Sequence, residues 1–324
     1  MAIGIGSPQE TLEMSLSEYQ VRFRIRDLLS ISGPGDFILG AGRPVDTSRM
    51  FEPDVSPYCF DLANRSLLCV STPDISAATF FYQAQRQYAR SVIKVPFESL
   101  PAGSASPVLI FSIGRCGSTL LVRALQAAGM RAVSELDFYR QAACHRPLDI
   151  SLRSAITGAT RLLPYSVIKL HLECNHAPLL IAGAFDSPRI MFILRDPVDW
   201  AASLRRISRN SLDPSWAVTL LRTGLLALEE LTRSYPVRIC YYEDFRELGA
   251  GCIEDVLSWV GWSGAVSRET LLAVAAKDAQ DGTFVSRASV RDVPDDLQFR
   301  ETFRREWSRL RPAPLIARLQ LKLL

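Results

Sequence analysis

The stretch PVLIFSIGRCGSTLL, residues 107–121, decides the fold class of this chain. An apolar run comes first, a turn with Gly114 and Gly117 follows, and Ser118 and Thr119 come directly after it. This order predicts a buried strand, a tight turn and the first turn of a helix. In such a junction, the backbone N–H groups of the turn and of the helix N-terminus can hold an oxyanion. We therefore predict a phosphate-type ligand at this loop.

The loop lacks the lysine that nucleoside-triphosphate-binding loops carry. Their pattern is G-x-x-x-x-G-K-[ST], whereas here Gly117 is followed directly by Ser118. Arg115 is the only cation within the loop. A plain strand–turn–helix junction is the alternative interpretation, because glycine and serine are common in such turns.

The chain beyond the loop alternates short apolar runs with helical segments. The predicted strands are residues 108–113, 166–172, 189–194 and 237–242, and the predicted helices are residues 118–129, 198–208, 215–235 and 252–262. Apolar strands separated by helices favour a parallel sheet that is covered on both faces. We therefore predict a three-layer α/β/α fold with a central parallel sheet and a P-loop-like anion-binding loop. In the longest helix, the expected buried stripe consists of Trp216, Leu220, Leu221, Leu225, Leu228 and Leu231.

A connector rich in proline, glycine and serine, LPAGSASP (residues 100–107), precedes the loop and marks a boundary. We therefore predict an N-terminal extension or accessory subdomain over residues 1–100 and the α/β domain over residues 101–324. Within the extension, the alternation in VRFRIR (residues 21–26) predicts a strand. Residues 74–93 have helical spacing, with Asp74 as the expected N-cap.

Composition limits the class of protein. A net charge of only +3 over 324 residues gives no support for a nucleic-acid-binding surface. The seven cysteines have no CxxC spacing, which favours free thiols over a disulfide framework or a zinc site. The N-terminus has no secretory signal pattern, and no apolar run reaches the ~20 residues that a membrane span needs. We expect a cytoplasmic protein without a membrane span.

A second anion site is predicted in MFILRDPVDWAASLRR, residues 191–206. Arg195 follows an apolar run, Asp196 and Pro197 favour a helix start, and Ser203 comes eight residues after Arg195. In open α/β sheets, ligands bind beyond the carboxyl ends of the strands. Two such strand ends, each with an arginine, indicate a ligand with two separated phosphate-like groups. As an alternative, Arg195 pairs with Asp196 or Asp199 on the surface.

Three motifs in this order resemble the sulfotransferase family: GRCGSTLL (residues 114–121), ILRDPVDWAAS (residues 193–203) and YYEDF (residues 241–245). The resemblance covers roughly residues 108–262, about half of the chain. Members of the family transfer a sulfuryl group from 3′-phosphoadenosine 5′-phosphosulfate (PAPS) to a hydroxyl or amine acceptor by in-line displacement. The resemblance thus implies a PAPS-dependent enzyme that releases 3′-phosphoadenosine 5′-phosphate (PAP) and needs no metal.

The resemblance also implies roles for individual residues. The 5′-phosphosulfate would be bound by Arg115, Cys116, Gly117, Ser118, Thr119 and Leu120, the 3′-phosphate by Arg195 and Ser203, and Tyr242 would lie near the adenine. Arginine in the loop, and Leu120 where the cytosolic branch has tryptophan, are more like the carbohydrate-, tyrosine- and bacterial-type sulfotransferases. The family's basic, glycine-rich C-terminal loop is absent. Ser286 and Arg287, in DGTFVSRAS, are the residues that we expect at the 3′-phosphate in its place.

Sulfuryl transfer builds negative charge on the leaving phosphate and, for a hydroxyl acceptor, requires a base. Arg115 and Lys169 are the expected sources of positive charge. Two residues compete as the base. His171, in VIKLHLE, resembles the family's KTHLP strand, and Glu135, in VSELDFY, occupies the place where arginine-loop members carry a glutamate. We favour Glu135 because the loop is of the arginine type, with His171 as the alternative.

The acceptor is expected to be a small molecule, a carbohydrate or a lipid. The N-terminal hundred residues form a lid or one wall of the acceptor site, or else they extend the core or mediate a homodimer. Two other functions fit the same loop: a nucleotide-dependent kinase or other phosphotransferase, and a catalytically silent PAP-binding protein.

Overall fold

The computed structural model describes residues 10–16, 30–145, 149, 151–247, 249–281, 283, 286, 288–290 and 293–322. The predicted strand at residues 21–26 and the predicted ligand-binding Arg287 lie outside these residues. The chain forms two compact units, which are described separately. Unit 1 comprises Met1–Ser106, Glu135–Pro164 and Leu180–Ser187, and unit 2 comprises Pro107–Ser134, Tyr165–Leu179 and Pro188–Leu324.

Unit 2 contains the predicted parallel sheet. Its strands are β6 (Val108–Ser112), β7 (Ala132–Ser134), β8 (Val167–Lys169), β9 (Arg189–Leu194) and β10 (Val237–Tyr241). They lie in the order β10-β9-β6-β8-β7, and every neighbouring pair is parallel. The central strands are apolar and buried on both faces, as a parallel sheet between two helical layers requires. The predicted fold class is confirmed.

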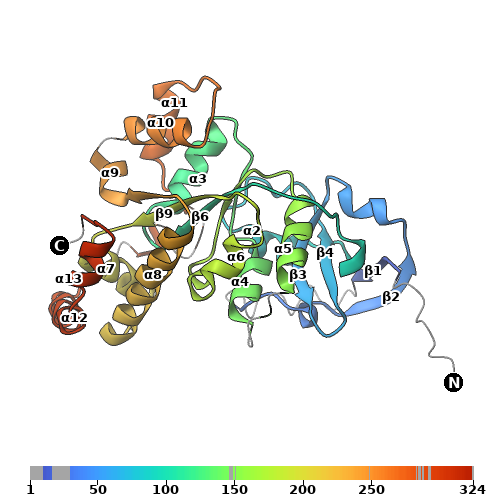
Figure 1. Cartoon of the computed structure of the whole chain (residues 1–324), viewed down its shortest axis with the longest axis horizontal. Coiled ribbons are helices and arrows are strands. Elements are labelled where there is room, and N and C mark those ends of the chain that lie inside the picture. Colours follow the sequence, from blue (N-terminus) through green and yellow to red (C-terminus); the bar gives the residue numbers. More distant parts are fainter. Residues whose placement is uncertain are drawn as a thin grey trace. The chain divides into compact units, whose positions relative to one another are not determined.

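Helices cover both faces of this sheet (Figure 1). One layer holds α3 (Ser118–Ala127), α10 (Ala250–Trp259) and α11 (Arg268–Ala276), and the other holds α7 (Pro197–Ile207), α8 (Pro214–Ser234) and α12 (Leu297–Arg309). The remaining elements of unit 2 are η4 (Leu172–His176), α9 (Tyr242–Glu247), η5 (Ala288–Val290) and α13 (Ala313–Arg318). Helix α6 (Pro178–Ala182) begins in unit 2 and ends in unit 1.

The buried face of α8 differs from the prediction at its first turn. Leu221, Leu225, Leu228 and Leu231 are buried as expected, but Trp216 is 52% exposed and Leu220 is only partly buried. Ala217 and Val218 begin the buried stripe instead. The reason is the 3.6-residue period: positions 217, 218, 221, 225 and 228 share one face, which leaves Trp216 on the other.

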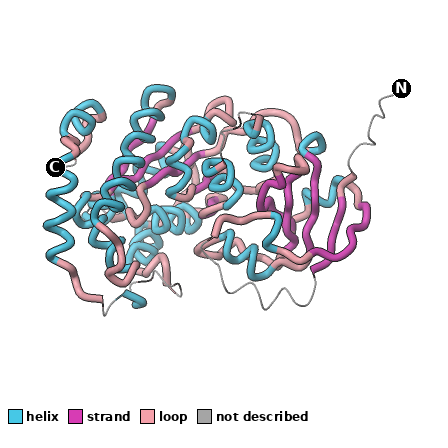
Figure 2. The backbone as a smooth tube through the Cα atoms, turned by 90° about the horizontal axis from the view of Figure 1, so that it is seen from below, coloured by secondary structure: helices cyan, strands magenta, loops and turns pink. Residues whose placement is uncertain are grey.

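Unit 1 is built on a second, antiparallel sheet, whose strands Figure 2 shows side by side. Its strands lie in the order β2-β1-β5-β4-β3, and their bounds are β1 (Leu12–Leu16), β2 (Leu39–Pro44), β3 (Val55–Asp61), β4 (Ser66–Ser71) and β5 (Ser91–Pro96). The helical elements are η1 (Pro34–Asp36), η2 (Thr47–Phe51), α2 (Phe81–Tyr88), η3 (Phe97–Ser99), α4 (Asp137–Cys144) and α5 (Leu152–Arg161). Phe60 packs edge-on against Phe97 and Phe138 in the core of this unit.

The helix predicted over residues 74–93 is much shorter in the structure. Asp74 does not cap it; its carboxylate accepts the N–H of Ser76 in a local turn, and α2 begins only at Phe81. Residues 91–93 belong to β5, which pairs with β1 on one side and β4 on the other. The β-branched residues Val92 and Ile93 favour a strand, and pairing with a strand on each side stabilises this conformation over a helix.

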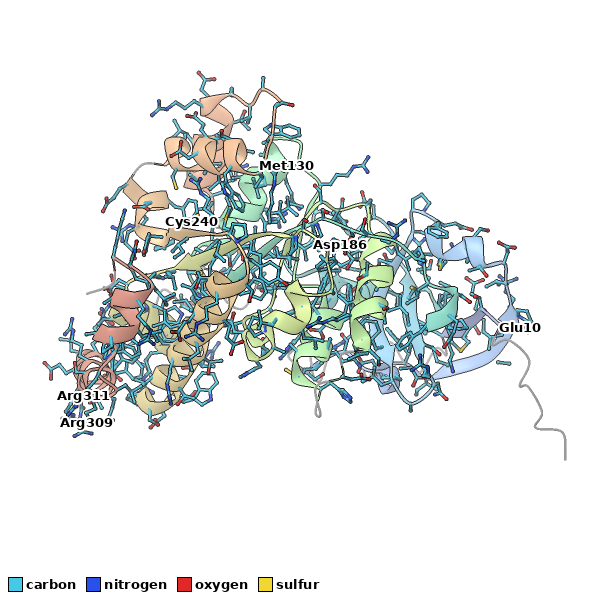
Figure 3. All side chains as sticks on the ribbon, viewed as in Figure 1. Glu10, Met130, Asp186, Cys240, Arg309 and Arg311 are labelled. Atoms are coloured by element: carbon cyan, nitrogen blue, oxygen red, sulfur yellow. The ribbon has the colours of Figure 1, made fainter. Side chains whose placement is uncertain are left out.

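All seven cysteines are free thiols in the structure. None of the helices in the described part of the chain combines the length and apolar character of a membrane span. Figure 3 labels Cys240 on β10, where its side chain is buried, and Arg309 at the end of α12, where it pairs with Glu306 at 2.6 Å.

Helix α8 packs closely at Gly224 on Ile113, the residue that follows β6. A Cβ at Gly224 would lie 2.6 Å from Ile113 Cγ2, a methyl group on a stiff β-branched side chain. We expect Gly224→Ala to destabilise the protein by about 1–3 kcal/mol through overpacking. Gly251→Ala in α10 is the matched control, since nothing lies within 4 Å of its Cβ position, and it should stabilise by about 0.5–1 kcal/mol. Urea unfolding midpoints measure both, and equal midpoint shifts of the same sign would contradict the close packing.

Candidate functional site

All five strands of the parallel sheet end at one edge of unit 2. The residues at or just beyond these ends are Tyr242 after β10, Arg195 after β9, the loop after β6, Lys169 on β8 and Ser134 on β7. Their order along the edge follows the strand order, so residues that are far apart in sequence become neighbours. This edge is where open α/β sheets bind ligands.

The loop after β6 has the backbone shape of an anion-binding nest. Gly114, Arg115 and Gly117 have positive φ angles of 73°, 49° and 80°. Such left-handed conformations turn successive N–H groups towards a common concavity. Gly117 is also required by space, because a Cβ there would lie 2.7 Å from Cδ2 of Tyr242. The loop is therefore shaped to hold an oxyanion next to the Tyr242 ring.

Side chains of other elements donate hydrogen bonds to the carbonyl groups of this loop. Trp200 Nε1 donates to the carbonyls of Ile113 and Gly114, both at 3.0 Å, and Asn175 Nδ2 donates to that of Ser112 at 2.9 Å. Arg195 Nη1 donates to the carbonyl of Arg115 at 3.0 Å. The loop is thus held through its acceptors.

The donors of the loop remain available to a ligand. The first N–H groups of α3 have no intrahelical acceptor. In the part of the chain that the structure describes, the N–H groups of Cys116, Gly117 and Thr119 have no hydrogen-bond acceptor. Three backbone donors therefore meet at the predicted oxyanion position.

The Arg115 side chain joins the two predicted anion sites. Its Nε lies 3.5 Å from Ser203 Oγ on α7, and its Nη1 donates to Oε1 of Gln280. Burial and the positive charge of Arg195 lower the pKa of Arg115 to about 10, while the Asp278 carboxylate opposes this shift. Residues 88 positions apart in sequence therefore meet in one cationic cluster.

Arg195 is not used for surface ion pairing. Asp196 caps α7 by accepting the N–H groups of Val198 and Asp199, and the Asp199 carboxylate binds Arg300 at 2.8 Å. Arg195 has no ion pair among the described residues, and its Nε is buried without a hydrogen-bond partner there. Its guanidinium carbon lies 4.5 Å from the centroid of the Tyr242 ring. The ring is therefore held between Gly117 and Arg195.

Arg206 is a further cation that the sequence reasoning missed. It comes one helical turn after Ser203 on α7, so the two share a face. Its charge contributes to the lowered pKa of Arg115, and its Nε is buried without a hydrogen-bond partner among the described residues. Its position three residues after Ser203 in a predicted helix is the sequence feature that indicates that the two side chains lie on one face.

The other predicted loop residues line the start of α3. Ser118 and Thr119 are buried in its first turn and Leu120 is partly buried. Cys116 is fully buried, and burial raises the pKa of its thiol, against the effects of the Ser112 hydroxyl and the Lys169 charge. At the C-terminal segment, the Ser286 hydroxyl is hydrogen-bonded to Ser289 of its own turn. Among the described residues of this segment, Gln280 contacts Arg115.

The predicted catalytic residues fall in both units. Lys169 ends β8 and is 5% exposed, and His171, at the start of η4, is 7% exposed. Glu135 is the first unit 1 residue after β7, and its φ angle of 63° is unusual for a residue other than glycine. Burial and the negative charge of Glu135 raise the pKa of Tyr82 to about 12. Backbone strain of this kind is found at functional sites.

The fold and the loop define an α/β protein whose loop between β6 and α3 has the backbone shape of an anion-binding turn. No protein-family model matches the sequence, and no curated protein matches it. Within the described residues, no group of three or more His, Cys, Asp or Glu side chains is placed to hold a metal ion.

Several solved structures are similar to the chain. A sulfotransferase from Alicyclobacillus acidocaldarius is 14% identical, covers 68% of this chain and 98% of its own, and has a TM-score of 0.45. A sulfotransferase from Mycobacterium avium is 13% identical, with coverages of 68% and 79% and a TM-score of 0.43. A mouse sulfotransferase complexed with PAP is 15% identical, with coverages of 69% and 85% and a TM-score of 0.38. All three of these proteins are named sulfotransferases, the family that the three sequence motifs resemble.

The role of Trp200 as a support of the loop can be tested. Trp200→Phe keeps a buried aromatic ring but leaves the carbonyls of Ile113 and Gly114 without their donor. We expect a loss of about 1–3 kcal/mol in unfolding free energy, because buried acceptors lose their hydrogen bonds. Trp216→Phe, at an exposed position on α8, is the control and should change stability by less than about 0.5 kcal/mol. Similar denaturant midpoints for both variants would contradict the supporting role.

Proposed function

We propose that this chain is a PAPS-dependent sulfotransferase that transfers a sulfuryl group to a hydroxyl or amine of an acceptor. The observation that carries the proposal is the convergence of the loop after β6 with Arg195 and Ser203 on one cationic cluster. The loop supplies backbone donors for one anionic group, and Arg195, Ser203 and Arg206 supply side chains for a second. A nucleotide with two anionic ends, such as PAPS, matches these donors.

In this proposal the loop stabilises the leaving phosphate. PAPS supplies the activated sulfuryl group, and negative charge grows on its 5′-phosphate as the bond to sulfur breaks. The N–H groups of Cys116, Gly117 and Thr119, with the guanidinium of Arg115, are the donors for that charge. Because they are fixed before the ligand arrives, little reorganisation is needed in the transition state. Lys169, at the end of the neighbouring strand β8, is the second cation.

Glu135 is the proposed base, with His171 as the alternative. A base must accept the proton of the attacking hydroxyl as the bond to sulfur forms. The left-handed backbone of Glu135 costs conformational energy, which favours a functional reason for its position. His171 is suited to proton transfer near neutral pH. We further propose that the acceptor is a small molecule, a carbohydrate or a lipid. The chain would belong to the arginine-loop branch of the family.

Ligand preference tests the proposal against a kinase. We expect PAP to raise the melting temperature, since a ligand that binds only the folded state stabilises it by about 2.7 kcal/mol at one hundred times its Kd. ATP with Mg²⁺ should have a smaller effect, because it lacks the 3′-phosphate. Arg195→Ala should weaken PAP binding about 10- to 100-fold through loss of charged hydrogen bonds.

Arg209→Ala, at an exposed position just beyond α7, is the matched control and should leave PAP binding unchanged. Stabilisation by ATP with Mg²⁺ and none by PAP would overturn the proposal in favour of a phosphotransferase. PAP binding without turnover of PAPS on any acceptor class would favour the silent PAP-binding protein.

Separate variants of the two candidate bases decide between them. We expect Glu135→Gln to lower the rate of PAPS consumption about 10²- to 10⁴-fold, the usual size of a general-base contribution. PAP affinity should not change, because the substitution leaves the loop and the arginines intact. His171→Ala is compared under the same conditions, with PAP released from PAPS in the presence of acceptor as the measurement. Full turnover by Glu135→Gln together with a large loss in His171→Ala would transfer the role to His171.

A further inference from the structure

A short turn after α11 reaches the arginine of the anion-binding loop. Helix α11 packs on α3, the helix that the loop begins, and the chain then turns at Asp278–Asp281. Within this turn, Gln280 Oε1 accepts a hydrogen bond from Arg115 Nη1. In the part of the C-terminal segment that the structure describes, this turn carries a side chain that contacts Arg115.

The turn holds Gln280 through its own backbone. Asp278 Oδ1 accepts the N–H of Gln280 at 3.1 Å, and the Asp281 N–H donates to the Asp278 carbonyl at 3.0 Å. The Gln280 carbonyl accepts both the N–H and the hydroxyl of Thr283, at 3.1 and 2.6 Å. The backbone of Gln280 is therefore held by hydrogen bonds on both sides, which fixes the point from which its side chain extends to Arg115.

The polarity of the Arg115 contact fixes which end of the amide remains available. A guanidinium has only donors, so the atom that faces it must be the carboxamide oxygen. The Gln280 Nε2 group, with two N–H donors, has no acceptor among the described residues. The same Arg115 guanidinium lies beside Ser203 Oγ, so this amide belongs to the cluster that contains Arg195 and Ser203.

We propose that Gln280 is a ligand-binding residue: its oxygen orients Arg115, and its Nε2 donates a hydrogen bond to the phosphate that Arg195 and Ser203 hold. This inference rests on the proposed function, in which that group is the 3′-phosphate. A neutral amide suits the position because the positive charges of Arg195 and Arg206 already repel that of Arg115. A fourth cation would add to this repulsion, whereas an amide adds donors without charge.

Two substitutions distinguish a ligand-binding role of Gln280 from one in which its side chain only contacts Arg115. Gln280→Leu removes both hydrogen bonds and should lower PAP affinity about five- to tenfold, as one or two hydrogen bonds are worth. Gln280→Glu keeps an acceptor for Arg115 but places a negative charge beside the phosphate, so its loss should be larger and should grow at low salt. The affinity of 5′-AMP, which has no 3′-phosphate, should fall less than that of PAP in both variants.

Isothermal titration of the full chain with PAP and with 5′-AMP measures these affinities, and a denaturation midpoint for each variant confirms folding. Gln320→Leu, at an exposed position, is the control for replacing a glutamine by leucine. Unchanged or tighter PAP binding by Gln280→Leu would show that the side chain only occupies Arg115, and the inference would be wrong. Equal losses for PAP and 5′-AMP would also overturn it. If the unaltered chain bound 5′-AMP as tightly as PAP, the proposed function itself would fail first.

Discussion

The backbone of the loop at residues 114–117 has three left-handed conformations, and the rest of the site depends on what holds it there. Trp200 and Arg195 bind its carbonyls, and the Tyr242 ring lies against Gly117. These supports come from α7, the end of β9 and the start of α9. A loop that is fixed through its acceptors can offer its donors to a ligand without rearranging. This constraint explains why a glycine is needed at 117 and a buried indole behind the loop.

Charge is the second feature that follows from this arrangement. Arg195 both supports the loop and lies on the Tyr242 ring, so its guanidinium is committed to the cluster. Arg115 and Arg206 add two more positive charges, and the mutual repulsion contributes to the lowered pKa of Arg115. Among the described residues, Arg195 and Arg206 have no ion pair and a buried Nε without a partner. Partly buried cations of this kind are stabilised when an anion binds beside them. The cluster is therefore arranged for a ligand with more than one negative charge.

The fold class and the loop were predictable because their signals are local. Apolar runs alternating with helical periodicity indicate a parallel sheet, and two glycines before Ser118 and Thr119 indicate an anion-binding turn. The antiparallel sheet of unit 1 was not predicted, since part of its pairing, such as that of β1 with β5, joins strands about 80 positions apart in sequence. The helix over residues 74–93 was wrong for the same reason. Residues 91–93 have a helical neighbour in sequence, but pairing with β1 and β4 makes them a strand.

The sequence by itself determined the parallel α/β class, the strand-end positions of Arg115 and Arg195, and the start of α7 at Asp196. These features depend on residue type, short-range periodicity and local caps. Only the tertiary structure decided that Arg115 meets Ser203, that Tyr242 lies between Gly117 and Arg195, and that Gln280 reaches the loop. Such contacts join residues that are 47 to 165 positions apart. They are created by the order of the strands in the sheet and the packing of α11 on α3, which no local pattern specifies.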